Sequence, residues 1–515
     1  MTERIVLRSL SDMTLANAER VAFDGAAIEL GLEAEALIAE GRRRFETYID
    51  DKGGYVYGST TAPGSRAKIV LSKQDSQRQG ATLGSFFSLK AGPGGEMLPE
   101  RCVRLAIFAR LSNAMTGSGK LRPATVRAFA NLLQAPPEVP LQSVACSGEV
   151  MALGWLVAPL ADLPLQIGEA MALINGSPFA TAMASDVALT TRRRLQMALR
   201  VFALSIEAAQ CPAGHFDRRL ADLWLDPHYK ESLERLDALL CGSHREQLEH
   251  QAPTSWRVVP NVLAGALHAL AECSRSAEIG LQSLKDNPTF LRTADGSGED
   301  AVVSSSGYHD HRAAKAIDQI NSALVDLCVL ASRQVAHLLD GGTLGLPPLL
   351  ARGGDGVGAE YLAWGMTEPL ATARRAAEAT TLDAGLHDPA GNQSDIASLA
   401  IIAYGKHRVV ARSFDACFAS LAVTVALALE FRGTQPPIML RPLALHLAAA
   451  IRSAARRIDA VGEPLRQVQA MMRDCCEEMR SAELAPFDSI FGQVLAGEQG
   501  VVEAELGQIT NAPRV

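Results

Sequence analysis

Stretches in which apolar residues recur every three or four positions are the feature that most constrains the fold of this chain. They occupy residues 30–48, 101–115, 192–209, 262–284, 311–339 and 440–480, with few glycines or prolines inside. This spacing places apolar side chains on one face of an α-helix, so each stretch is predicted to be a long helix with a buried face. Long helices bury such faces against one another, and the sequence therefore predicts a mainly α protein built as a helical bundle.

Glycine and proline cluster between these stretches. The clusters at residues 53–64, 92–99, 295–307 and 341–358 are predicted to be loops. A short strand-like run from Lys68 to Leu71 predicts a small mixed N-terminal lobe ahead of the bundle. We therefore expect an N-terminal lobe over residues 1–200 and a central and C-terminal helical bundle over residues 201–515.

The composition limits what such a protein can do. With 515 residues, of which 48% are hydrophobic, the chain can bury a large core. A formal net charge of -8 argues against a nucleic-acid-binding surface, which needs clustered lysines and arginines. The nine cysteines are scattered without a CxxC pair, so the sequence predicts neither a metal site nor a disulfide framework. A reducing cytoplasm fits this pattern.

The sequence gives no sign of secretion or of a membrane span. Residues 1–15 lack the apolar segment of a secretory signal. The longest apolar run, residues 417–429, is too short to cross a bilayer and is predicted to be a buried helix. We therefore expect a cytoplasmic protein with no membrane partner.

One tripeptide, Cys146-Ser147-Gly148, carries chemistry of its own. The Gly148 amide nitrogen can attack the Cys146 carbonyl, and loss of water from the ring and from Ser147 then leaves an exocyclic methylidene. Glycine suits the attacking position because it has no Cβ and tolerates a strained turn. The product is an electrophile, which no ordinary side chain supplies. Taken alone, the tripeptide also fits an ordinary polar turn.

The surrounding motifs favour the reactive interpretation. Residues 142–153, QSVACSGEVMAL, resemble the GSVGASGDLAPL stretch of the histidine/phenylalanine ammonia-lyase family. Four further stretches match in the family's order: VYGSTTAPG, RLSNAMTGSGKLRP, EAMALINGS and EIGLQSLKDNP. The resemblance implies an ammonia-lyase-like bundle of long helices. It also implies a 4-methylideneimidazol-5-one (MIO) group formed autocatalytically from Cys146-Ser147-Gly148 in the N-terminal lobe. The family assembles as a homotetramer in which each active site collects residues from several subunits.

The resemblance implies roles for three further residues. Tyr57 matches the family tyrosine that takes the substrate's β-proton as a general base. Asn175 matches the asparagine that contacts the MIO and the amino side of the substrate, since an amide both donates and accepts. Arg257 matches the arginine whose bidentate fork binds the substrate carboxylate. The structural alternatives are a loop anchor for Tyr57, an Asn-Gly turn for Asn175 and a surface ion pair for Arg257.

Four more positions are expected to line the substrate pocket. Leu89 falls in the pair that governs substrate choice in the family, and it favours an unadorned ring or an alkyl side chain. Tyr308 replaces a family phenylalanine and keeps an aromatic wall. Gln393 is retained, whereas Ser394 stands where histidine-specific members carry glutamate. The sequence therefore predicts a small-molecule substrate, an amino acid with a largely apolar side chain, and not histidine.

Three classes of function remain open. The first is an MIO-dependent ammonia-lyase or 2,3-aminomutase, two activities that share every residue named above. The second is a catalytically altered paralogue with a binding or scaffold role, favoured by Thr254 in place of a family tyrosine and by Ala62-Pro63 in the loop after Tyr57. The third is an elimination enzyme of the argininosuccinate-lyase or fumarase type, whose serine-loop signature the chain does not match.

Overall fold

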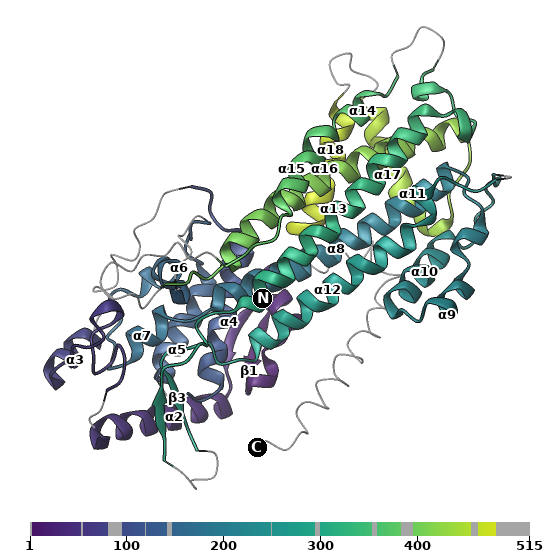
Figure 1. Ribbon diagram of the computed structural model, residues 1–515. Coiled ribbons are helices and arrows are strands. Elements are labelled where there is room, and N and C mark those ends of the chain that lie inside the picture. The colour runs from purple at the N-terminus through teal and green to yellow at the C-terminus, as the bar shows by residue number, and fades with distance from the viewer. Residues whose placement is uncertain are drawn as a thin grey trace.

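Long helices form the body of the protein. The computed structural model describes residues 3–52, 55–80, 95–118, 120–141, 147–248, 250–293, 299–352, 358–382, 395–454 and 462–479. Helices α8 (Pro178–Ala208), α12 (Val259–Leu281), α13 (His311–Asp340) and α16 (Ala400–Arg432) lie side by side in an elongated bundle (Figure 1). The predicted mainly α fold is therefore confirmed.

Helix α8 is the centre of this bundle. It begins at Pro178, whose fixed φ suits the first helical position, and almost all of its residues are buried. A helix that is covered on every side needs partners for its polar groups. Two of them are charged: Asp186 pairs with Arg101, and Arg194 pairs with Asp415.

A smaller lobe, built mostly from the N-terminal part of the chain, lies at one end of the bundle (Figure 1). Its two short strands, β1 (Arg4–Leu7) and β2 (Ala27–Leu30), pair in parallel with Arg4 opposite Ala27. The lobe is thus mixed, as predicted. Its helices are α1 (Leu15–Phe23), α2 (Leu32–Lys52), α3 (Lys73–Gly80), α4 (Glu100–Met115), α5 (Pro123–Ala130), α6 (Val150–Leu156) and α7 (Glu169–Ile174).

The remaining helices cover the bundle and its other end. Helix α11 lies at the end away from α6 and α7 (Figure 1). The covering helices are α9 (Ala221–Trp224), α10 (Pro227–Leu240), α11 (Thr254–Arg257), α14 (Tyr361–Trp364), α15 (Thr367–Ala376), α17 (Arg441–Ala454) and α18 (Glu463–Glu477).

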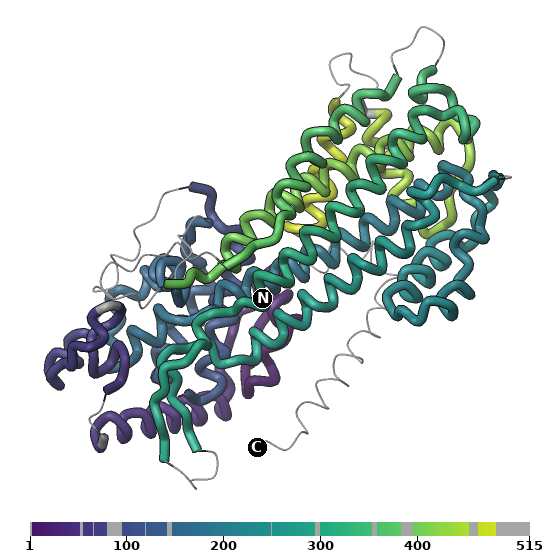
Figure 2. The backbone as a smooth tube through the Cα atoms, viewed as in Figure 1, coloured from purple at the N-terminus to yellow at the C-terminus, as the bar shows by residue number. Residues whose placement is uncertain are grey.

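The segment between α12 and α13 returns to the N-terminal lobe, as the tube in Figure 2 shows. It carries a two-stranded antiparallel hairpin, β3 (Thr289–Leu291) and β4 (Ala301–Val303). Phe290 of β3 packs edge-on against Phe45 of α2, with ring centroids 5.5 Å apart. Residues near 285 and 308 are thereby brought beside the turn at Ser147.

Three local predictions were wrong. Within residues 440–480 the structure describes two helices, α17 and α18, and the second begins at Glu463 with Gly462 as its cap and Pro464 in its first turn. The run from Lys68 to Leu71 forms only an isolated bridge between Val70 and Thr61, since its side chains find no sheet to cover. The predicted loop at 295–307 contains β4. The proposed boundary at residue 200 stays a prediction, and α8 runs through it.

Helices α13 and α16 are long and apolar enough to cross a membrane by length and composition. Helix α16 contains residues 417–429, so the apolar helix is longer than the sequence run suggested. In their most apolar windows, 56% of α13 and 72% of α16 are buried inside the protein. Both therefore act as core helices of the bundle, and the prediction of a buried helix at 417–429 is confirmed.

Candidate active site

The turn Ser147–Glu149 stands at the start of α6. Gly148 has a φ of 72°, a conformation that only glycine adopts without cost. A Cβ added at Gly148 would lie 2.2 Å from Oδ1 of Asn175. Both the backbone conformation and the available space therefore require glycine. Cys146 lies outside the described residues.

Glu149 fixes this turn to the bundle. Its side chain is buried, and its two oxygens accept the backbone N–H groups of Phe179 and Ala180 at 2.7 and 2.9 Å. These are amides of the first turn of α8, where a helix favours a negative charge. Burial nevertheless raises the pKa of Glu149 to about 8. Glu149 was not among the predicted site residues, although the family stretch carries an acidic residue after its glycine.

Asn175 lies directly against the turn. Its Nδ2 donates to the backbone oxygen of Asn287 at 3.0 Å, which fixes the orientation of the amide. Its buried Oδ1 has no hydrogen-bond partner among the described residues. A buried acceptor without a partner costs free energy, so it marks a position where a ligand can bind. The adjacent N–H of Gly176 donates to the backbone oxygen of Gly148 at 3.1 Å.

A buried arginine joins three segments beneath Asn175. Arg110 of α4 donates to the backbone oxygens of Asn175 at 2.8 Å and Lys285 at 3.1 Å, and also to that of Ala172. A Cβ on Gly176 would lie 2.1 Å from Nη1 of Arg110, so glycine is required for this close approach. Burial lowers the pKa of Arg110, and it lowers the pKa of the Lys285 amine to about 7.

The loop before α13 covers the turn from the other side. Nε2 of His309 lies 3.2 Å from Oγ of Ser147, at hydrogen-bond distance. The Tyr308 ring meets the His309 ring edge-on, with centroids 4.9 Å apart. Tyr308 also lies 3.5 Å from the position of a Gly148 Cβ, so the structure brings it to the turn as predicted from the sequence. The contact of His309 with Ser147 was not predicted, since the sequence gives no distance between them.

The Tyr57 loop reaches the site through Met171 of α7. A Cβ on Gly58 would lie 2.2 Å from Cε of Met171, and Sδ of Met171 lies 3.7 Å from Nδ2 of Asn175. The Tyr57 hydroxyl accepts the backbone N–H of Gly64 at 2.8 Å. The Tyr57 hydroxyl thus bonds within its own loop, and Met171 lies between Gly58 of that loop and Asn175.

Arg257 lies elsewhere. It ends α11, at the end of the bundle away from α6 and α7 (Figure 1). Its Nη2 donates to Oγ1 of Thr254 at 3.4 Å, and its buried Nε has no partner among the described residues. A single subunit thus does not bring Arg257 to Ser147. Leu89, Gln393 and Ser394 lie outside the described residues.

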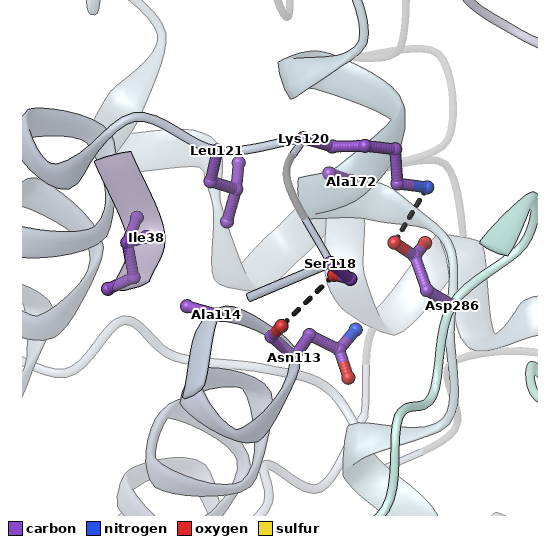
Figure 3. Close-up of a pocket in the computed structure, with 8 residues that line it drawn as sticks. All are labelled: Ile38, Asn113, Ala114, Ser118, Lys120, Leu121, Ala172 and Asp286. Atoms are coloured by element: carbon purple, nitrogen blue, oxygen red, sulfur yellow. Dashed lines mark hydrogen bonds and ion pairs between the residues drawn. The ribbon is translucent and has the colours of Figure 1, made fainter. Parts of the chain in front are cut away.

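A small cavity lies under the site, between α4 and the loop at Asp286 (Figure 3). Lys120 and Asp286 form a fully buried ion pair at its edge, with Nζ and Oδ2 2.6 Å apart. Burial lowers the pKa of Lys120, and Asp286 opposes that effect. The cavity volume of about 10 Å³ admits one water molecule at most. It is therefore a structural void and not the substrate pocket.

The turn, the facing amide and the buried carboxylate define a site in which a Ser-Gly pair is held against an asparagine at one end of a helical bundle. The chain belongs to the aromatic amino acid lyase family, whose model matches residues 13–162 and 156–453. The protein is thus an enzyme, as the sequence predicted, and its family is one of lyases. This match favours the first of the three classes of function left open by the sequence.

Some known proteins resemble this chain in sequence and others in fold. Histidine ammonia-lyase from Burkholderia mallei is 26% identical over 479 residues, covering 87% of this chain and 92% of that protein. Among solved structures, an ergothioneine-degrading ergothionase from Treponema denticola has a TM-score of 0.82 at 15% identity, over 92% of this chain and 99% of that one. A tyrosine aminomutase from Streptomyces globisporus has a TM-score of 0.75 at 23% identity, over 90% and 97% of the two chains.

Proposed function

We propose that this protein is an MIO-dependent ammonia-lyase or 2,3-aminomutase that acts on an amino acid with a largely apolar side chain. The observation that carries the proposal is the geometry of Gly148, which has a φ of 72° and faces Oδ1 of Asn175, an acceptor without a hydrogen-bond partner among the described residues. A turn that excludes a Cβ, a serine before the glycine and a facing amide acceptor fit the MIO group. When formed from Cys146-Ser147-Gly148, that group supplies an electrophile that makes the α-amino group a better leaving group.

The residues around the turn support distinct parts of the reaction. Oδ1 of Asn175 is free to accept a hydrogen bond from the substrate ammonium. Tyr57 takes the β-proton as general base, and the Gly64 N–H that its oxygen accepts favours the ionised phenol that this role needs. Tyr308 forms an aromatic wall beside the turn. Leu89, Gln393 and Ser394 complete the pocket in this proposal on the strength of their sequence positions.

The position of Arg257 supports a homotetramer with shared sites. Arg257 stands at the far end of its own bundle, so the carboxylate-binding fork of any one site comes from another subunit. Closed symmetric assemblies reuse one interface in every subunit, and each site then receives one arginine. The proposed location of this assembly is the cytoplasm.

Intact-mass spectrometry of the purified protein tests the proposal. We expect a mass lower than that of the encoded chain by two water molecules. A peptide map would place both losses in the segment containing Cys146, Ser147 and Gly148. A full, unmodified mass would refute the MIO assignment. It would favour the alternative, a catalytically altered ammonia-lyase paralogue with a binding or scaffold role.

Ammonia release and β-amino acid formation then identify the reaction. Phenylalanine, tyrosine, histidine and a panel of aliphatic amino acids are incubated with the purified enzyme. Free ammonia indicates a lyase and a β-amino acid indicates an aminomutase. Thr254, which replaces the family tyrosine, is the residue to revert if the mass shows the water losses but no substrate is turned over.

A further inference from the structure

The hydroxyl of Ser147 is the group that must leave if the tripeptide is to mature, and within the part of the chain that the structure describes the His309 side chain contacts it. Nε2 of His309 lies 3.2 Å from Oγ of Ser147. The other acids and bases described near the turn have different partners. Both oxygens of Glu149 accept amides of α8, and the Tyr57 hydroxyl accepts the amide of Gly64. His309 is therefore the side chain placed to exchange a proton with the Ser147 oxygen.

The loop that carries His309 is held on both sides. The His309 N–H donates to the backbone oxygen of Ser306 at 3.0 Å, and Oγ of Ser177 donates to the backbone oxygen of Gly307 at 3.1 Å. Oδ1 of Asn287 accepts the N–H of Ser305 at 3.0 Å. Ser177 also directly precedes α8, the helix that binds Glu149. The loop that carries His309 and the turn at Ser147 are thus both hydrogen-bonded at the start of α8.

From this geometry we propose that His309 is the general acid that protonates the departing hydroxyl of Ser147 during cofactor formation. The inference rests on the proposed function. Ring closure between the Gly148 nitrogen and the Cys146 carbonyl carbon releases the first water. In the second step the Ser147 Cα–H proton passes to solvent, its electron pair forms the Cα–Cβ double bond, and the Cβ–Oγ bond breaks. The oxygen takes the Nε2 proton of the His309 imidazolium and leaves as water, and solvent then reprotonates the imidazole.

The local environment suits this role. The His309 side chain is only partly exposed, and burial, with a further contribution from His311, lowers the pKa of the imidazole. A lowered pKa makes the imidazolium a stronger acid towards the leaving oxygen, but it also leaves the protonated form in the minority at neutral pH, so it is the contact with Ser147 that carries the assignment. Partial burial also limits competing water around the Ser147 hydroxyl.

The experiment measures formation of the cofactor and not catalytic turnover. The full chain is synthesised in a cell-free translation system, quenched at intervals and measured by intact mass. For wild type we expect both waters to be lost. For His309→Gln, which keeps an N–H donor but has no acidic proton, we expect the first water to be lost normally. The second loss should be slower by about 100-fold or more, as is usual for removal of a general acid. The species lacking one water then accumulates.

Two further variants separate proton transfer from packing. His311→Gln, two residues away on α13, leaves the His309 contact with Ser147 in place and removes only the smaller cause of the lowered His309 pKa, so it should mature within a few-fold of the wild-type rate. His309→Ala should mature slowly, and added imidazole should restore the second water loss, which a purely structural role would not allow. Loss of both waters at the wild-type rate in His309→Gln, or no rescue of His309→Ala, would overturn the inference. No water loss in wild type would instead refute the proposed function itself.

Discussion

Substitution of Glu477, the last residue of α18, would show which contacts hold this C-terminal helix on the bundle. Its carboxylate pairs with Arg194 of α8 and with Arg101 of α4, the latter at 3.4 Å. Burial raises the pKa of Glu477, but Arg194 and Arg101 outweigh that effect and hold it at about 2, against an ordinary 4.5. A difference of this size corresponds to about 3 kcal/mol of stabilisation at neutral pH.

We therefore expect Glu477→Gln to weaken the docking of α18 by about 3 kcal/mol, which makes local opening of the helix about 100-fold more frequent. The direction in which this stabilisation changes with pH follows from the lowered pKa of Glu477. The stabilisation is complete above the ordinary value of 4.5 and is lost as the pH falls towards about 2. The difference between variant and wild type should therefore be full at pH 7 and shrink below about pH 4.5.

Hydrogen exchange of the α18 amides measures this opening directly. Glu478→Gln is the matched control, because Glu478 is the next residue and its side chain is 65% exposed, 3.8 Å from Arg473. An exposed pair of this kind contributes little, so the control should exchange like wild type. If Glu477→Gln also exchanged like wild type at pH 7, the ion pairs with Arg194 and Arg101 would not be what holds α18.

Three further predictions concern the proposed cofactor and substrate. Ser147→Ala should abolish both activity and water loss while costing on the order of 1 kcal/mol of stability, since it removes one hydrogen bond; activity assays and circular dichroism check this. Cys146→Ala should keep both water losses in the intact mass, because the side chain of that residue takes no part in cyclisation. Histidine should be a poor substrate. We expect this because Leu89 and Ser394, if they line the pocket as the sequence predicts, would leave both imidazole nitrogens unpaired, at about 1 to 3 kcal/mol each, or at least about thirty-fold in combination. Histidine emerging as the best substrate in the ammonia assay would show that these positions do not line the pocket.

The periodicity of the sequence predicted the long helices well, because apolar spacing and burial have the same cause. It failed where a local signal outweighed the pattern. The apolar spacing continues through residues 440–480, but Gly462 and Pro464 start a second helix there. Lys68 to Leu71 has strand-forming residues but no neighbouring sheet to pair with, and Val70 remains 66% exposed.

Only the site residues that lie in recognisable sequence motifs could be predicted from the sequence. Ser147 and Gly148 were predicted from the chemistry of the tripeptide, and Asn175 from its match to a family motif. The contact between His309 and Ser147 joins residues 162 positions apart, and it depends on how the segment after α12 returns to the lobe. The role predicted for Arg257 depends on how the subunits assemble. The sequence of one chain does not show to which subunit's active site a residue contributes.

The separation of Ser147 and Arg257 along one subunit has a genetic consequence. If the two belong to a shared site, a Ser147→Ala chain still contributes an intact Arg257 to a neighbouring site. An Arg257→Met chain likewise still contributes an intact Ser147. Each variant alone should be inactive. Co-expressed and randomly assembled, they should rebuild about a quarter of the sites, since each site then needs one intact contribution from each of two chains. Two null alleles of this gene should therefore complement one another, because the activity belongs to the assembly and not to the single polypeptide.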